Sequence, residues 1–344
     1  MSEKLFFASD YMEGAHPAIM RRLEETNLVK SPGYGSDSFS ESAREKIRSA
    51  CRAPEAEVYF LAGGTQANSV VIGTMLRPYQ GVLAAETGHV SVHESGAIEA
   101  GGHKVITLPQ RDGKLSAENV RQWTETYLGD ENRSHMVMPG LVYISQPTEM
   151  GTIYSLEELT GLSRVCREYG IALYADGARL AYALACPEND VALPDLAALC
   201  DAFYIGGTKC GTLFGEAVVF PKPGTVPHFF TMVKQRGALL AKGRIAGIQF
   251  DTLFTDGLYE EIGASAVRIA DRIRKALSEK GYDQAFVAPT NQVFPVLTDG
   301  QLRRLSDKVE MSFWERTPDG RTIVRLASSW ATREEEADAL IALL

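Results

Sequence analysis

The chain has 344 residues, which favours one large domain joined to a smaller one, because single domains typically hold about 100–150 residues. Apolar residues make up 45% and charged residues 23%, a composition that excludes a disordered or fibrous protein. The 35 basic and 44 acidic residues sum to a net charge of −9. No excess of Lys and Arg exists to neutralise phosphates, so we expect neither nucleic acid nor an anionic membrane as a partner.

Cysteine usage and the N-terminus both indicate a cytoplasmic protein. The five cysteines are irregularly spaced and form no CxxC pair: Cys51, Cys166, Cys186, Cys200 and Cys210. This pattern argues against a disulfide framework or a zinc ribbon and fits a reducing compartment. Residues 1–10 lack the basic region and long apolar core of a signal peptide, and no run of about 18 apolar residues occurs.

Between residues 57 and 220, short apolar runs alternate with helical patterns, as in a mainly parallel sheet between helices. Strands are expected at 57–61, 81–85, 104–108, 140–145, 171–174, 202–205 and 217–220. Helices are expected at 65–76, 116–128 and 155–169. Ser155 and Glu158 have capping-box spacing, and Gly170 is a typical C-terminal stop, so the third helix is well delimited.

After residue 257 the pattern changes to a long amphipathic helix near 260–280, followed by strand, helix, strand and helix. We therefore expect an α/β fold of two domains. The large domain covers residues 1–255, N-terminal segment included, and the small C-terminal α/β domain covers 256–344. The first dozen residues are too short for a domain of their own and could cross to either one.

A glycine-rich turn at residues 61–68 leads from an expected strand into an expected helix. Gly63, Gly64 and Thr65 there can offer backbone N–H groups and a hydroxyl to a phosphate at the helix N-terminus. Alone, Gly-Gly before a helix is typical of a plain tight turn. The segment matches neither the Walker motif nor GxGxxG.

Two further residues stand where expected strands end. Asp176 closes one strand, with Arg179 three residues later, and Lys209 follows another strand in a glycine-rich bend. Taken singly, Asp176 reads as a helix cap with Arg179 as its surface partner, and Lys209 as a solvated loop lysine. A lysine beside apolar walls is also a candidate for a lowered pKa and imine chemistry. With the phosphate turn, these residues supply the parts that pyridoxal phosphate needs.

Motifs in a fixed order extend this pattern along nearly the whole chain: Phe7-Ala-Ser-Asp10, Gly33-Tyr-Gly-Ser-Asp37, Gly64-Thr-Gln-Ala-Asn68, His89-Val-Ser-Val-His-Glu-Ser-Gly96, Gln146-Pro-Thr-Glu-Met-Gly151, Asp176-Gly-Ala-Arg179, Gly206-Gly-Thr-Lys-Cys-Gly211 and, more loosely, Val324-Arg-Leu-Ala-Ser-Ser-Trp330. The series resembles the threonine aldolase family of fold-type I pyridoxal-phosphate enzymes, in particular its low-specificity L-threonine aldolase branch. The resemblance implies the transferase-like fold of that class and pyridoxal 5'-phosphate as the cofactor.

The resemblance also implies roles for individual residues. Lys209 would form the Schiff base, Asp176 would hold the pyridine nitrogen, and His89 would stack on the ring. The phosphate would be surrounded by Gly64, Thr65 and Thr208.

Further roles implied by the resemblance concern the substrate and the subunit boundary. Ser9, Arg179 and Arg325 would bind the substrate carboxylate, with Arg179 also next to the cofactor. Tyr34, in the family's Tyr-Gly motif, would lie near the substrate at a subunit boundary. Arg244 matches an arginine that in relatives reaches the phosphate of the neighbouring subunit. The resemblance thus implies a homo-oligomer, a dimer or tetramer, with shared active sites.

One position departs from the better-known bacterial threonine aldolases, which carry His where this chain has Glu149. A partly desolvated Glu can still accept the proton of the substrate hydroxyl. The catalytic base therefore stays open between His89, Glu149 and an ordered water. His89, His93 and Glu94 do not form an HExxH motif and have no clear third ligand, so these residues are not expected to bind a catalytic zinc, and no metal ligands are assigned. A structural monovalent or calcium ion at a subunit edge stays open.

The resulting hypothesis is a pyridoxal-phosphate-dependent aldolase. It would cleave L-threonine, L-allo-threonine or a related β-hydroxy-α-amino acid to glycine and an aldehyde. Two alternatives stay open: another reaction on the same cofactor, namely β-elimination, transamination or racemisation, and a non-catalytic protein that keeps the cofactor pocket.

Overall fold

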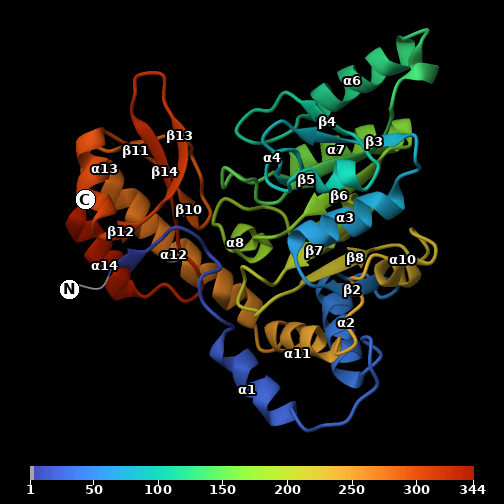
Figure 1. The fold of residues 1–344 in the computed structure, drawn as a ribbon, viewed down its shortest axis with the longest axis horizontal. Coiled ribbons are helices and arrows are strands. Elements are labelled where there is room, and N and C mark those ends of the chain that lie inside the picture. The colour runs from blue at the N-terminus through green and yellow to red at the C-terminus, as the bar shows by residue number, and fades with distance from the viewer. Residues whose placement is uncertain (1–3) are drawn as a thin grey trace.

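A seven-stranded sheet forms the centre of the larger part of the protein, described for residues 4–344 by a computed structural model (Figure 1). The strand order is β2-β8-β7-β6-β5-β3-β4, and only β8 runs antiparallel to its neighbours. The strands are β2 (Glu57–Leu61), β3 (Gln80–Ala85), β4 (Val105–Leu108), β5 (Met138–Ser145), β6 (Ala172–Asp176), β7 (Ala202–Gly206) and β8 (Glu216–Phe220). Each strand expected from the sequence overlaps one of them.

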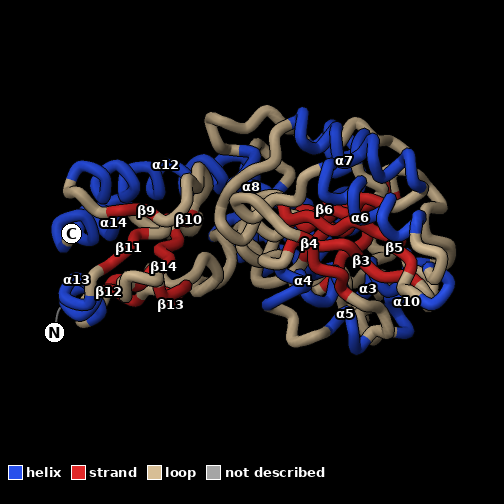
Figure 2. The backbone as a smooth tube through the Cα atoms, turned by 90° about the horizontal axis from the view of Figure 1, so that it is seen from above, coloured by secondary structure: helices blue, strands red, loops and turns tan. Residues whose placement is uncertain are grey.

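Helices cover both faces of this sheet, which explains why its strands are apolar on both sides. Figure 2 shows α6 (Ala117–Gly129) and α7 (Leu156–Tyr169) on one face, and α3 (Gly64–Met75) and α5 (Ala97–Ala100) on the other. Neighbouring residues of β5 accordingly enter different cores: Val142 packs towards α7, and Leu141 towards α3.

The boundaries of α7 agree with the capping signals in the sequence. The Ser155 hydroxyl accepts a hydrogen bond from the Glu158 N–H at 3.2 Å, and the Glu158 carboxylate accepts one from the Ser155 N–H at 2.8 Å. Gly170 ends the helix with φ 65°, a left-handed conformation that glycine adopts without strain. The prediction of this helix is confirmed.

Helices α2 (Ser38–Ala50) and α11 (Arg244–Leu253) pack on each other next to β2, and α1 (Pro17–Thr26) packs on α11. Helices α2 and α11 approach closely at Gly247, where a Cβ atom would lie 2.3 Å from the Ser40 hydroxyl oxygen. The remaining helices of this part are α4 (His89–Val92), α8 (Leu180–Leu184), α9 (Leu193–Leu199), α10 (Phe229–Gln235) and the 3-10 turn Arg133–His135.

The smaller part is built on the long helix α12 (Leu258–Glu279), which agrees with the helix expected near 260–280. A second sheet packs on it in the order β10-β14-β11-β9, with β13 paired to β14. The elements that follow α12 in the smaller part are β9 (Asp283–Gln284), β10 (Gln292–Val293), β11 (Pro295–Leu297), α13 (Asp299–Ser306), β12 (Val309–Glu310), β13 (Ser312–Arg316), β14 (Thr322–Ala327) and α14 (Glu334–Leu343).

The N-terminal segment joins the two parts of the chain. Its strand β1 (Leu5–Phe6) pairs in parallel with β12, and Phe7 is buried in the same core as Ile269 and Leu326. Residues 5–7 therefore pack on the small part, one of the two placements expected for this segment. We propose that the two domains divide near residue 256 and that the N-terminal strand β1 belongs to the small domain.

Within residues 4–344, no helix combines the length and the apolar character needed to cross a lipid bilayer.

Candidate active site

A cavity of about 360 Å³ opens where β5, β6 and β7 end. In an open α/β sheet, this edge is where ligands bind. Ten of the residues singled out from the sequence line the cavity: Gly63, Gly64, Thr65, His89, His93, Glu149, Asp176, Arg179, Thr208 and Lys209. Segments more than 140 residues apart in the chain therefore meet at one place.

The glycine turn after β2 forms one wall of this cavity. Gly63 is the N-cap of α3, and the Ala62 N–H is held by the Gln66 side-chain oxygen at 2.9 Å. A Cβ atom at Gly64 would lie 3.0 Å from the Tyr204 hydroxyl, so only glycine fits there without a shift. The first N–H groups of α3 lack helical acceptors, as at every helix N-terminus, and they favour an anion.

Asp176 is buried at the end of β6. Its carboxylate accepts hydrogen bonds from Tyr143 Oη at 2.7 Å, Asn68 Nδ2 at 2.9 Å, the Ala178 N–H at 3.0 Å and the Tyr204 hydroxyl. Burial opposes ionisation, but the charge of His89 and these donors outweigh it and hold the pKa of Asp176 below its usual range. Asp176 is thus an ionised carboxylate with fixed orientation.

Lys209 lies in the connection from β7 to β8, next to Gly207. Burial and the positive charge of Arg179 lower the pKa of its amine, whereas Asp10, Asp176 and Glu216 oppose that shift. The ammonium nitrogen lies 5.8 Å from the centre of the Tyr11 ring. At a given pH, a lowered pKa leaves a larger fraction of Lys209 as the neutral, nucleophilic amine, and the lowered pKa agrees with the expectation from the sequence.

His89 begins α4 and is oriented by a buried carboxylate. Its Nδ1 lies 2.7 Å from Glu94 Oε1, which also accepts a hydrogen bond from Asn68 Nδ2 at 2.7 Å. Burial alone would lower the pKa of His89, but Glu94 and Asp176 raise it above its usual value. This pair favours the protonated imidazole.

Glu149 lies beside His89 in the cavity, two residues after the cis Gln146–Pro147 peptide. Its Oε1 accepts hydrogen bonds from the Ser145 hydroxyl at 2.6 Å and from the His89 backbone N–H at 3.0 Å. Burial raises the pKa of the Glu149 carboxyl despite these donors. Glu149 is therefore a stronger base than an exposed glutamate.

Arg179 pairs with Asp10 and not with Asp176. Its Nε and Nη2 donate to the two carboxylate oxygens of Asp10 at 2.6 and 2.9 Å, and Asn291 Nδ2 donates to Asp10 at 2.9 Å. Although burial raises the pKa of Asp10, Arg179 and Lys209 bring it down to about 2. The reading of Arg179 as a surface partner of Asp176 is wrong, because both members of its ion pair are buried.

Arg325 and Ser9 lie beside the cavity and do not line it. Arg325 Nη2 donates to the Ala8 carbonyl at 3.0 Å, which places the guanidinium next to Ser9. Burial lowers the pKa of His93, a residue of the cavity wall, and the charges of His89 and Arg325 lower it further. Within residues 4–344, the buried Arg325 Nε has no hydrogen-bond partner.

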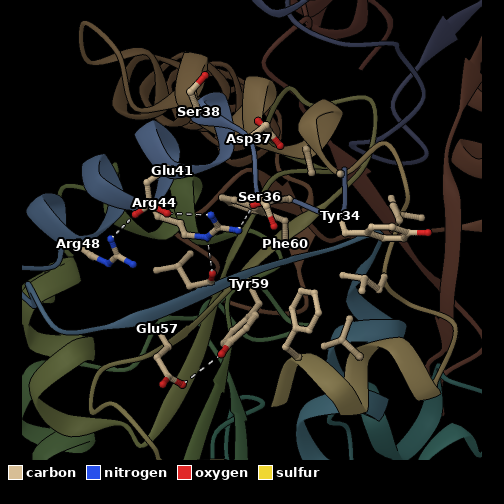
Figure 3. A pocket seen from close by; sticks show the side chains of 18 residues that line it. Tyr34, Ser36, Asp37, Ser38, Glu41, Arg44, Arg48, Glu57, Tyr59 and Phe60 are labelled. Carbon is tan, nitrogen blue, oxygen red and sulfur yellow. Dashed lines mark hydrogen bonds and ion pairs between the residues drawn. The ribbon is translucent and has the colours of Figure 1, made fainter. Parts of the chain in front are cut away.

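Tyr34 and Arg244 lie away from the Lys209 cavity. Tyr34 lines a second cavity, of about 590 Å³, between α2, β2 and α10, together with Arg44 and Tyr59 (Figure 3). Arg244 Nη2 donates to the Thr26 carbonyl at 2.6 Å, at the end of α1. A single chain therefore does not bring these two residues to the other site residues.

Several residues of the site had no role in the sequence analysis. They are Asp10, Asn68, Glu94, Tyr143, Tyr204 and Glu216. Asp10, Asn68 and Glu94 stand inside motifs quoted above, so their positions carried a signal. Tyr143 and Tyr204 read as ordinary apolar strand residues, and only the sheet aligns them with Asp176. One feature of the sequence could have indicated Glu216 as a site residue: it is an acid directly before a fully apolar strand segment.

Comparisons with known proteins agree with this geometry. Residues 7–299 match the β-eliminating lyase family. A low specificity L-threonine aldolase of a Pseudomonas species is 31% identical over 98% of this chain and 96% of its own length. A threonine aldolase structure from Leishmania major shares 42% identity and a TM-score of 0.95, covering 98% of both chains. An aspartate aminotransferase structure from Thermus thermophilus, 16% identical, has a TM-score of 0.72 over 99% of this chain and 91% of its own, and shares the fold.

Asp10→Asn is expected to lower the free energy of unfolding by about 3–5 kcal/mol, because it leaves the buried Arg179 guanidinium without its counter-charge. Urea unfolding followed by circular dichroism measures the change. Asp271→Asn removes the carboxylate of a surface ion pair with Arg274 and should change stability by less than about 1 kcal/mol. Equal effects of the two variants would show that the Asp10–Arg179 pair does not support the fold.

Proposed function

The chain belongs to the β-eliminating lyase family, and from this premise we propose that it is a pyridoxal-phosphate-dependent aldolase. Its substrate is L-threonine, L-allo-threonine or a related β-hydroxy-α-amino acid, which it cleaves to glycine and an aldehyde. The observation that carries the proposal is the meeting of Lys209, the ionised Asp176 and the N-terminus of α3 in one cavity. The names of the relatives support the choice of substrate.

The residues of the cavity fit the cofactor. Lys209 offers an amine of lowered pKa, and Asp176 offers an ionised carboxylate that would hold a protonated ring nitrogen. Gly64 and Thr65 offer a helix N-terminus to the phosphate, and Thr208 lines the same cavity. When bound, pyridoxal phosphate supplies the sink for the electron pair of the broken Cα–Cβ bond.

The carboxylate of the substrate is assigned to Arg325, with Ser9 and Arg179 beside it. Arg325 is the strongest candidate because its buried Nε lacks a partner within residues 4–344 and can donate to a ligand. Arg179 keeps only part of its donor set, since two of its nitrogens bind Asp10. Two arginines on one carboxylate orient the α-carbon, and that orientation decides which bond is broken.

Glu149 is the residue to which we assign the proton of the substrate hydroxyl. His89 is a poor acceptor, because Glu94 holds its Nδ1 and favours the imidazolium. Glu149 lines the cavity as a carboxylate of raised pKa, oriented by Ser145. It would take the O–H proton while the carbonyl of the aldehyde forms, and the imidazolium of His89 would supply positive charge inside the cavity.

Lys209→Ala is expected to abolish both the visible absorbance of the cofactor-loaded protein and its release of acetaldehyde from L-threonine and L-allo-threonine. Coupled oxidation of NADH measures the acetaldehyde, and amino-acid analysis measures glycine. Lys275→Ala, on the exposed side of α12, serves as the matched control and should keep full activity. Release of ammonia and 2-oxobutanoate without glycine would instead establish β-elimination.

The acid limb of the pH profile should depend on Glu149. Activity requires the carboxylate, so kcat/KM falls as the pH drops through the pKa of Glu149, which burial raises above 4.5. Glu149→Gln should lower kcat by about 10²–10⁴-fold and remove that limb. Ser145→Ala takes away a hydrogen bond to the carboxylate and should move the limb to higher pH. A Glu149→Gln enzyme with unchanged kcat would exclude Glu149 as the base.

We further propose that the protein is a homo-oligomer, a dimer or a tetramer with shared active sites, formed through the surface around Tyr34 and Arg244. Large apolar side chains stand exposed there, including Leu28 at 91%, Phe230 at 46% and Tyr34 at 44%. Exposed apolar side chains grouped around two cavities are typical of a surface that a partner covers. A second copy seated there would also bring Arg244 towards the site of its neighbour.

Light scattering after gel filtration is expected to give the mass of a dimer or tetramer. Phe230→Asp should weaken the assembly, because a charge would be buried in the contact. Val287→Asp changes a side chain that is 90% exposed on the small domain, and it should leave the mass unchanged. A fully active wild-type monomer would contradict the shared site.

A further inference from the structure

Glu216 is a buried acid at the start of β8 that the mechanism above does not use. Only 3% of its surface is exposed, and the strand that follows it is entirely apolar. In the sheet it lies opposite Leu61 of β2 and Gly206 of β7, and its side chain lines the Lys209 cavity. A carboxyl group at such a place needs a physical reason, because burying a charge is unfavourable.

Few groups stabilise the ionised form of Glu216. Its Oε2 accepts a hydrogen bond from the Gly207 N–H at 2.9 Å, and the Thr208 hydroxyl and the charge of Lys209 also favour ionisation. Asp176 opposes it from the end of β6. The other titratable groups whose charge interacts with Glu216 are Tyr174, Tyr204, Cys210 and, on α12, Tyr259.

The balance of these effects leaves Glu216 poised between its two protonation states. Burial, the largest effect, outweighs the donors and Lys209 and raises the pKa of Glu216 to about 7. A small change of charge in the cavity is then enough to move the carboxyl group from one state to the other.

The phosphate site provides such a change. Leu61, the register partner of Glu216, leads directly into the Gly63-Gly64-Thr65 turn at the N-terminus of α3. The turn and the carboxyl group line the same cavity, so a bound phosphate and an ionised Glu216 repel each other. Lys209, whose charge favours the carboxylate, is itself engaged once the cofactor is attached.

We propose that Glu216 takes up a proton from solvent when the cofactor phosphate binds at the N-terminus of α3, and returns it when the phosphate leaves. Glu216 is then a positioning residue. As a neutral acid it keeps its oxygen on the Gly207 N–H, and so holds the turn before Lys209 without repelling the phosphate. The inference rests on the proposed function, since it needs a phosphorylated cofactor in this cavity.

The linkage has a definite sign. A carboxyl group that is half ionised near pH 7 in the free protein and neutral in the loaded protein takes up a proton on binding. Cofactor affinity therefore falls as the pH rises above about 7, by up to tenfold per pH unit for one proton. This fall continues until the pH reaches the higher pKa of the loaded state.

The test is the pH dependence, from pH 6.5 to 9, of the dissociation constants of two probes for the cofactor-free protein. Pyridoxal 5'-phosphate carries the phosphate, and 5'-deoxypyridoxal has the same aldehyde without it. Their ratio removes the contribution of the Lys209 amine. In the wild type, the advantage of the phosphorylated probe should shrink with pH by up to tenfold per unit more than in Glu216→Gln.

Two further variants complete the design. Glu216→Asp keeps a carboxyl group and should keep the steeper slope, which separates titration from packing. Glu118→Gln, an exposed change in the first turn of α6, should behave as the wild type.

Equal slopes in the wild type and Glu216→Gln would overturn the inference while leaving the aldolase proposal intact. Failure of the wild type to bind pyridoxal 5'-phosphate at all would overturn both.

Discussion

The ionised carboxylate of Asp176, buried at the end of β6, is the constraint on which the rest of the site depends. Its charge is stabilised by donors from three different elements: Tyr143 on β5, Asn68 on α3 and Tyr204 on β7. These donors reach it only if the strands keep their register and α3 packs on that face. The ionised state of Asp176 therefore depends on the fold, because a buried carboxylate without these donors would be protonated.

Other charged groups around Asp176 are also held by partners within the protein. Asn68 uses one amide group to bind both Asp176 and Glu94, and Glu94 in turn holds His89. On the other side, Asp10 neutralises Arg179 from the N-terminal segment. Several charges in and beside the cavity, those of Asp176, His89 and Arg179, are thus already paired or hydrogen-bonded within the protein. Such pre-organisation leaves few groups to rearrange when a charged ligand enters.

The sequence was a good guide to the fold and a partial guide to the site. Periodicity and caps located the strands and α7, because those signals are local. The strand-end residues Asp176 and Lys209 could be found for the same reason. The partner of Arg179 could not: Asp10 lies 169 residues away in the chain and reaches it through the packing of β1 on the small part. Tyr143 and Tyr204 were missed because apolar strands give no sign of which hydroxyl will meet a carboxylate.

The sequence by itself determined the class of fold, the positions of Asp176 and Lys209 after their strands, and the turn at Gly64, because each depends on its immediate neighbours in the chain. Only the tertiary structure decided which charges are paired, and so which groups are acids or bases. The packing pairs Asp10 with Arg179 and Glu94 with His89, and it places Glu216 in the same cavity as the glycine turn before α3. The physical reason is that a pKa is set by burial and by charges across space, and neither can be read along the chain.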